Sequence, residues 1–359
     1  MRGFFKRHLG LHLWMLGLGA VFLFYKWAIS SAAAANAVTA VTQRIKDGYA
    51  ALWYLVPFSV VEWFYVAFIL GGILWVAVLA VKLARKREGR RTVAYRGLAG
   101  LVCLGLSIWG FYCLFWGVNY YADGFQEKSG IYAQPVTVED LDRAATYFAQ
   151  KLAETAPLVQ RDEEGLYAED EDRVFAASVR VYDNLSREFP FLQRQDRVPK
   201  KMFFSRLFSM MNFTGFYTPF TGESNLNVDV PACLTPANIT HELAHQRGIA
   251  SEQECNFLAI VAAVSSDDPA YQYSGYLMGY IHLGNALYRA DREKWQAVYA
   301  LLPQEVILDL RYHSAYWDQF EGLTADVSQK IYDSTLKTYG QSDGIKSYGT
   351  VVDLLVAYY

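Results

Sequence analysis

Two histidines spaced four residues apart carry the clearest chemistry in this sequence. His241 and His245 lie on either side of Glu242 in the segment His241-Glu242-Leu243-Ala244-His245. On a helix this spacing puts both imidazoles on one face, where together they can bind one zinc ion. Glu242 then lies one residue further round, where it can act as general base on a water activated by the metal. The pattern predicts a zinc (Zn2+) metallopeptidase.

The flanking residues favour a helix around this motif. Thr235 can cap a helix start, and Pro236 suits the first turn. Gly248 follows the second histidine and is typical of the residue that ends a helix. We therefore expect the histidines to lie on a short helix that ends soon after His245.

A catalytic zinc site needs a third protein ligand, and two glutamates follow the histidines. Glu252 and Glu254 are two residues apart, and because two residues turn a helix by about 200°, both cannot face one metal. Ser251 and Glu254 form a capping box, which would turn the Glu254 carboxylate back to the N–H of Ser251. Glu252 shares a helix face with Asn256, a plausible partner behind the metal ligands. We predict Glu252 as the third ligand, with Glu254 as the alternative.

Other polar residues are weaker candidates for the site. Three that alternate along a strand-like segment could line a substrate cleft: Glu223, Asn225 and Asn227. Four could stabilise the oxyanion of a tetrahedral intermediate: Tyr276, Tyr280, His282 and His313. The first group could instead form a polar strand face with no role in binding. Each residue of the second group could instead serve only in helix packing. Cys233 and Cys255 could pair as a disulfide in an oxidising compartment.

The residues around the motif resemble those of a known family. The run HELAHQRGIASEQECNFLAI is similar to HELAHQxGxxxExEANFL, the signature of a bacterial membrane protein family of unknown function described as zinc-metallopeptidase-like. The likeness extends to three further segments: Gly215–Glu223, Tyr273–Leu277 and Ser347–Leu355. It implies a zincin-like catalytic domain. Because Ser251 stands where a metzincin has its third histidine, that class does not fit.

The second helix also resembles the third-ligand helix of gluzincins. In that pattern a glutamate binds zinc, and an acidic or amide residue four places on supports a histidine. The matching residues are Glu252 and Asn256, with Cys255 in place of the usual alanine. The interval from His245 to Glu252 is shorter than in most gluzincins. The resemblance implies the same ligand set as the spacing argument.

Three apolar stretches near the N-terminus are each long enough to cross a bilayer, which takes about 20 residues. They cover roughly residues 9–29, 58–81 and 97–118, and Trp and Tyr residues near their ends resemble an interfacial belt. The first stretch could instead be a cleavable signal peptide. An uncleaved helix is preferred because signal cores usually span only about 7–15 residues.

The basic residues predict the orientation of these helices. Most lie between the second and third stretches: Lys82, Arg85, Lys86, Arg87, Arg90, Arg91 and Arg96. By the positive-inside rule the N-terminus and this link are cytoplasmic. Three crossings then place the C-terminal region outside. We predict a multi-pass plasma membrane protein with a membrane region over 1–121 and an extracytoplasmic domain over 122–359.

The C-terminal region is predicted to be mainly α, an α+β domain with a short sheet. Helical periodicity covers residues 137–155, 171–189, 270–290, 304–320, 325–339 and 345–359. Residues 212–230 are rich in Thr, Gly, Phe, Tyr and Val, which favours a short sheet or an edge strand. In zincins an edge strand ahead of the zinc helix pairs with an extended peptide.

Composition limits the classes of partner. The net charge is −3 and no nucleic-acid motif is present, so we expect no nucleic acid partner. A transporter is disfavoured because three helices with few internal charges offer no polar pathway. The expected partners are the lipid bilayer and an extracytoplasmic peptide or protein substrate. A non-catalytic metal-binding scaffold or peptide-binding protein is the rival function, and the sequence indicates no oligomeric state.

Overall fold

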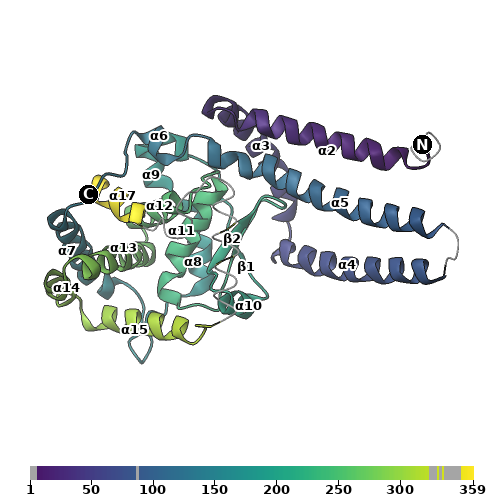
Figure 1. Cartoon of the computed structure of the whole chain (residues 1–359). Helices are drawn as coiled ribbons and strands as arrows, with labels where there is room; N and C mark the ends of the chain where they lie inside the picture. Colours follow the sequence, from purple (N-terminus) through teal and green to yellow (C-terminus); the bar gives the residue numbers. More distant parts are fainter. Residues whose placement is uncertain (1–5, 86–88, 323–329, 331–333, 335–348) are drawn as a thin grey trace. The chain divides into compact units, whose positions relative to one another are not determined.

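The computed structural model describes residues 6–85, 89–322, 330, 334 and 349–359. The chain forms two compact units (Figure 1). Unit 1 comprises Met1–Val56, Val60–Ala122 and Pro219–Gly222, and unit 2 comprises Pro57–Ser59, Asp123–Thr218 and Glu223–Tyr359. The fold is mainly α with one small sheet, so the predicted fold class is confirmed.

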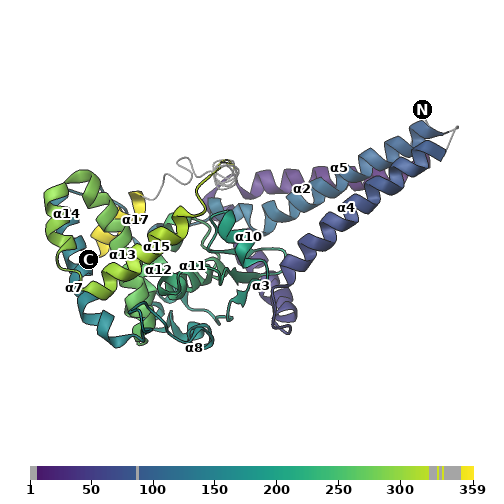
Figure 2. The ribbon, with the colours of Figure 1, turned by 90° about the horizontal axis from the view of Figure 1, so that it is seen from below.

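The described part of unit 1 contains four long helices, α2 (Leu9–Ala28), α3 (Ala32–Trp53), α4 (Val60–Arg85) and α5 (Arg90–Phe115). Helix α5 packs against both α2 and α4 (Figures 1 and 2). Helices α2, α4 and α5 are long and apolar enough to cross a membrane, and they correspond to the three predicted spans. Many of their large apolar side chains are exposed, as lipid-facing side chains would be.

The helix bounds in unit 1 differ in part from the predicted spans. Helix α5 begins at Arg90, seven residues before the predicted start at 97. Hydropathy marks only the apolar part of a helix, and basic residues can extend the helix into the membrane interface. Helix α3 lies in the link between the first two spans and was not predicted as an element. Its Arg44, Lys46 and Asp47 keep it below the apolarity of a span.

Unit 2 is a helical domain whose core is formed by α7, α11, α12 and α13. Among the residues that the structure describes, its helices are α6 (Phe125–Ser129), α7 (Val138–Thr155), α8 (Glu171–Ala177), α9 (Asp183–Glu188), α10 (Ser205–Met210), α11 (Thr235–Gln246), α12 (Glu252–Ser265), α13 (Pro269–Ala290), α14 (Arg292–Tyr299), α15 (Gln304–Asp318) and α17 (Gly349–Tyr358). Four of the predicted helical segments correspond to α7, α13, α15 and α17. Helix α12 packs against both α11 and α13, and it is buried along most of its length.

Two of the predicted helices, over 171–189 and 325–339, do not correspond to single described helices. The segment 171–189 is not one helix, because α8 and α9 are separated by a 3-10 turn at Ser178–Arg180. Just beyond that turn, Tyr182 is fully buried and donates its hydroxyl to the Thr240 carbonyl at 3.0 Å. The helical periodicity of the sequence continues through this segment, but the chain turns at residues 178–180 and Tyr182 makes this buried contact. The helix predicted over 325–339 lies largely outside the described residues.

The sheet has three short strands in the order β1-β3-β2. Strand β1 (Lys200–Lys201) pairs parallel with β3 (Glu223–Leu226), and β2 (Gly215–Thr218) pairs antiparallel with β3. The short sheet expected over 212–230 is therefore present, with β2 at its edge. Helix α11 packs against both β2 and β3 (Figure 1), which brings the sheet beside the two histidines.

Candidate metal centre

Helix α11 presents the two histidines on one face. The ring centroids of His241 and His245 are 4.9 Å apart, with the rings nearly perpendicular. Helix α11 begins at Thr235 itself, after a 3-10 turn at Ala232–Leu234, so Thr235 is not the cap that the sequence suggested. Gly248 has a φ of 85°, a left-handed conformation that ends the helix as predicted.

This turn brings the start of α12 back to the histidines. The Glu252 carboxylate lies between the rings, with Oε2 3.3 Å from Nε2 of His241 and Oε1 3.5 Å from Nε2 of His245. Burial alone would raise the pKa of Glu252, but His245 and His241 outweigh it and hold this pKa well below its usual value. The side chains of His241 and Glu252 keep 15% and 17% of their surface exposed, so the cluster is open to solvent.

The opposite nitrogen of each ring is held by a hydrogen bond. Nδ1 of His241 lies 2.9 Å from Oδ1 of Asn256, and Nδ1 of His245 lies 2.8 Å from the Ile249 carbonyl. When these Nδ1 atoms donate, each Nε2 carries a lone pair directed at Glu252. Metal-binding histidines commonly have such a partner on the second nitrogen. The predicted position of Asn256 behind a histidine matches this contact.

Cys255 adds a sulfur to the cluster. His241, His245 and Cys255 offer ligand atoms within 4.8 Å of one another and could hold a metal ion. The Cys255 Sγ lies 3.3 Å from Nδ1 of His245 and 3.4 Å from the Ile249 carbonyl. Burial raises the pKa of this thiol to about 12. Two overlapping donor sets therefore share the histidines and differ in the third group, Glu252 or Cys255. Cys255 and Cys233 are both buried free thiols, so the suggested disulfide is absent.

Glu242 lies beside this cluster with an unsatisfied oxygen. Its side chain is buried, and its Oε2 has no hydrogen-bond partner among the described residues. Burial raises the pKa of Glu242 to about 7, although the charges of His245 and His241 lower it. A buried carboxylate oxygen without a partner is costly and suggests that a ligand or water completes the site.

The structure corrects the role predicted for Glu254. Ser251 caps α12 and accepts from the Glu254 N–H at 3.4 Å, but the Glu254 carboxylate does not turn back to it. It accepts instead from the N–H groups of Phe125 at 2.8 Å and Gln126 at 3.1 Å, at the start of α6. A β-carbon on Gly124 would come within 2.4 Å of this carboxylate, so only glycine permits the approach. Glu254 points away from the histidines.

The predicted cleft residues are also placed differently. Glu223, Asn225 and Asn227 have fully buried side chains, and the first two lie on the central strand β3. Glu223 forms a buried ion pair with Lys200, and the Asn227 amide donates to Ser209 and to the Phe213 carbonyl. The expectation that these three side chains line a substrate cleft is wrong, because a hairpin beside a helix buries both strand faces.

The oxyanion candidates separate into different environments. His282 lies on α13 close enough to His241 to sense its charge, and burial, with a smaller contribution from that charge, lowers the pKa of His282 to about 4. Tyr276 packs among aromatic rings of the core, including Phe148. Tyr280 and His313 line a separate cavity. Of the four, only His282 remains a candidate at the metal centre.

Two further residues of the site come from β2 and were missed in the sequence. The pKa of Tyr217 is raised to about 12 by burial, while the charges of Arg194 and His245 lower it, so its phenol lies near His245. A β-carbon on Gly215 would lie 2.9 Å from Oε1 of Glu242 and 2.9 Å from the Asn225 carbonyl. Both residues stand in the segment predicted as a strand, but only the hairpin register shows which of them face α11.

Comparisons with known proteins identify the family. No curated protein and no solved structure matches the chain. A family profile with the description "Protein of unknown function (DUF3810)" matches residues 39–356, a range that includes most of α3, all of α4 and α5, the sheet and both helices of the candidate metal centre. Because the match covers most of the chain, the protein belongs to the DUF3810 family.

Proposed function

We propose that this protein is a membrane-anchored zinc metallopeptidase that hydrolyses extracytoplasmic peptides or proteins. The observation that carries the proposal is the convergence of three donors. The Glu252 carboxylate lies between the Nε2 atoms of His241 and His245, and the unpartnered Glu242 oxygen lies beside them. Two imidazoles and one carboxylate form a donor set typical of catalytic zinc, because it leaves a fourth position open.

The contacts between Glu252 and the two histidines are compatible with zinc ligation. Bonds of about 2.0–2.1 Å at tetrahedral angles put two ligand atoms roughly 3.3–3.4 Å apart. The two Glu252 oxygens lie 3.3 and 3.5 Å from the histidine nitrogens. Cys255 contacts the Nδ1 side of His245, where the Ile249 carbonyl already lies. A metal held by Cys255 would compete with that hydrogen bond, whereas Glu252 faces the two Nε2 atoms. We therefore assign Glu252 as the third ligand.

Zinc bound there would polarise a substrate carbonyl and acidify water. Glu242 then acts as general base: its Oε2 accepts the proton of the attacking water and passes it to the leaving amine. Glu242 lies on α11 with its side chain buried against Gly215 of β2, and its Oε2 has no hydrogen-bond partner among the described residues. Tyr217 lies close enough to His245, and His282 close enough to His241, to be affected by the histidine charge, and both are proposed to donate hydrogen bonds to the substrate carbonyl oxygen.

One observation favours the rival function of a non-catalytic metal-binding scaffold. The buried Cys255 thiol lies against His245, so a closed site with a fourth protein ligand is within reach of the same residues. Closed coordination is typical of structural zinc. Such a site needs no glutamate at position 242, and the rival does not explain why Glu242 is buried with an unpartnered oxygen.

The test compares Glu242→Gln with the parent protein, both as the full chain in detergent. Glutamine keeps the shape but cannot accept the proton. We expect unchanged zinc content and a fall in peptide-library hydrolysis of about 10²–10⁴-fold. His241→Ala should lose the metal in elemental analysis. Equal hydrolysis by the parent and Glu242→Gln would overturn the mechanism, and bound zinc with no hydrolysis by the parent would favour the scaffold.

A further inference from the structure

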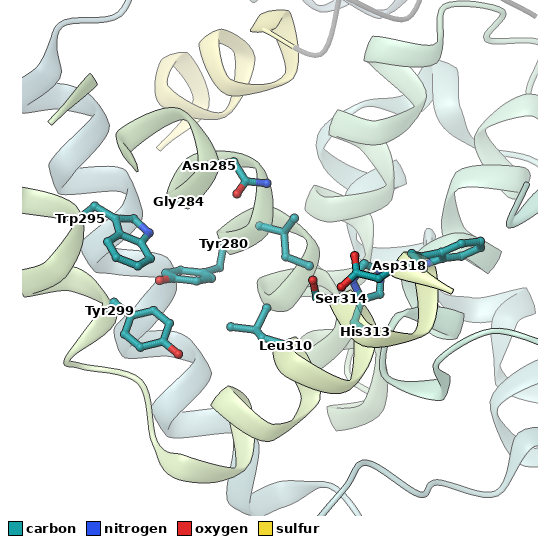
Figure 3. Close-up of a pocket in the computed structure, with 11 residues that line it drawn as sticks. Tyr280, Gly284, Asn285, Trp295, Tyr299, Leu310, His313, Ser314 and Asp318 are labelled. Atoms are coloured by element: carbon teal, nitrogen blue, oxygen red, sulfur yellow. Dashed lines mark hydrogen bonds between the residues drawn. The ribbon is translucent and has the colours of Figure 1, made fainter. Parts of the chain in front are cut away.

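Unit 2 contains a second site, a cavity of about 340 Å³ between α13, α14 and α15 (Figure 3). This volume is in the range of small-ligand sites. Residues from all three helices line it: Tyr280, Ile281, Gly284, Asn285, Trp295, Tyr299, Leu310, His313, Ser314, Trp317 and Asp318. None of them belongs to the proposed metal ligands, so the cavity has a chemistry of its own.

One end of the cavity is aromatic. Tyr280, Trp295 and Tyr299 gather there (Figure 3). The rings of Trp295 and Tyr299 lie 5.1 Å apart between centroids. Aromatic faces carry a negative quadrupole that attracts organic cations. Three rings around one space can therefore bind a planar or methylene-rich cation through cation–π contacts and apolar burial.

The Tyr280 hydroxyl at this end lacks a partner. The side chain is only 4% exposed, and its oxygen has no hydrogen-bond partner among the described residues. Burial raises the pKa of Tyr280, so the hydroxyl stays neutral and can accept a hydrogen bond from a ligand. A buried hydroxyl without a partner costs free energy, which a donor group entering the cavity would recover.

The charge of the lining also favours a cation. Asp318 is the one carboxylate among the described lining residues, which include no lysine or arginine. It shares its end of the cavity with His313 and Ser314 (Figure 3). Nε2 of His313 accepts a hydrogen bond from the Trp317 indole at 3.1 Å, so this nitrogen is not free to carry a second proton. An anion would meet Asp318 unfavourably, whereas a cation is attracted by it.

The cavity and the metal centre share α13. His282, which senses the charge of His241, directly follows Ile281 and lies one turn before Asn285, and both neighbours line the cavity. Helix α13 also packs against α11, which carries His241 and His245, so a peptide bound at the histidines has α13 nearby.

We propose that this cavity binds the side chain of an arginine or lysine in the peptide substrate. The cationic group lies against Trp295 and Tyr299 and donates to the Tyr280 hydroxyl. The aliphatic stem passes Ile281 and Leu310, and Asp318 attracts the charge on entry. The substrate assignment rests on the proposed peptidase function, but the binding of a basic side chain can be measured without hydrolysis.

The first experiment measures binding by calorimetry to the full chain in detergent, using the Glu242→Gln variant. The probes are the Nα-acetyl amides of arginine, norleucine and phenylalanine, and N-acetylglucosamine. We expect the arginine amide to bind about tenfold more tightly than the norleucine amide. Equal affinity for these two, tighter binding of the phenylalanine or sugar probe, or no saturable binding of any probe would overturn the proposal.

Two substitutions, Tyr280→Phe and Asp318→Asn, test whether the arginine amide binds in this cavity. Tyr280→Phe removes only the unpartnered hydroxyl, so arginine amide affinity should fall severalfold while the melting temperature stays equal or rises. Tyr288→Phe is the matched control, because Tyr288 lies two turns further along α13 and does not line the cavity. Asp318→Asn should lower the affinity and its dependence on salt. Unchanged affinity in both Tyr280→Phe and Asp318→Asn would overturn the assignment.

The outcome separates this proposal from the peptidase proposal. If the arginine amide binds as expected but the parent cleaves no peptide, the cavity stands as a cation site and the peptidase function fails. If the parent cleaves peptides without preference for arginine or lysine near the scissile bond, and Tyr280→Phe leaves the cleavage pattern unchanged, the peptidase stands and the role of the cavity fails.

Discussion

At the scale of single residues, the proposed ligand set depends on which nitrogen of each histidine faces the metal. Asn256 and the Ile249 carbonyl occupy the Nδ1 side of His241 and His245, so the Nε2 atoms point toward Glu252. These backing contacts fix ring orientation and increase the basicity of a ligand. Glu252 is placed for the role predicted from its spacing, and its metal binding stays a prediction.

Removing each third donor in turn tests the ligand set. Glu252→Ala should lower zinc occupancy sharply, because only two imidazoles would remain. Cys255→Ala should leave occupancy nearly unchanged, since its sulfur lies on the Nδ1 side of His245. Elemental analysis of the purified proteins measures both. Zinc retained in Glu252→Ala and lost in Cys255→Ala would instead identify the His/His/Cys set.

Glu254 is expected to affect stability and not the metal. Glu254→Ala leaves the N–H groups of Phe125 and Gln126 without their buried acceptor, which should cost about 1–3 kcal/mol of unfolding free energy. Glu254→Gln keeps an acceptor oxygen and should cost less. Chemical denaturation and zinc analysis check the two effects. Loss of zinc from Glu254→Ala in a folded protein would contradict this assignment.

At the scale of elements, the edge strand β2 is important because of how closely it approaches α11. Gly215 pairs with Leu226 in the hairpin and lies against the Glu242 side chain. The antiparallel register puts Gly215 and Tyr217 two residues apart, so both face the same side of the sheet. Strand β2 therefore contributes the Tyr217 side chain to the site, and Gly215, which has no side chain, leaves room for Glu242.

Adding one methyl group at this position tests the packing. Gly215→Ala puts a β-carbon 2.9 Å from Oε1 of Glu242, so the carboxylate or the strand must move. Because the φ of Gly215 is not in the left-handed region, the backbone itself tolerates alanine. We expect zinc to stay bound and turnover to fall roughly 10–100-fold, as small misplacements of a catalytic group do. Full turnover with bound zinc would show that the approach has no role.

At the scale of the whole molecule, the described residues include three helices of membrane length, which precede the domain that carries the candidate metal centre. Their number and apolar surface associate the protein with a membrane, and the basic link between α4 and α5 predicts its orientation. That orientation decides whether the substrate is cytoplasmic or extracytoplasmic. The proposed extracytoplasmic substrate depends on it.

Cysteine labelling in intact cells measures the orientation. The four native cysteines are buried, so background labelling should be low. A membrane-impermeant maleimide should label Tyr359→Cys in intact cells, and Arg90→Cys only after permeabilisation, because the basic link is predicted inside. Labelling in the reverse order would place the metal centre in the cytoplasm and exclude an extracytoplasmic substrate.

Local sequence patterns predicted many of the helices, the three apolar stretches of membrane length and the histidine pair. Each depends on periodicity or capping within about one or two turns, as with Ser251 at the start of α12 or Gly248 at the end of α11. The close placement of Glu252 and Asn256 against the histidines also follows from short spacing, since α12 begins directly after the turn at Gly248.

Only the tertiary structure decided the partners that lie far apart in the chain. Glu254 caps a helix 128 residues away, which no local pattern encodes. Glu223 was predicted to line a cleft but is buried against Lys200, because β1 arrives from another part of the chain. Gly215, Tyr217 and the aromatic cavity likewise depend on how a hairpin or three helices pack. The periodicity of a sequence predicts which residues share one face of a helix or strand, but only tertiary packing determines which other residues that face contacts.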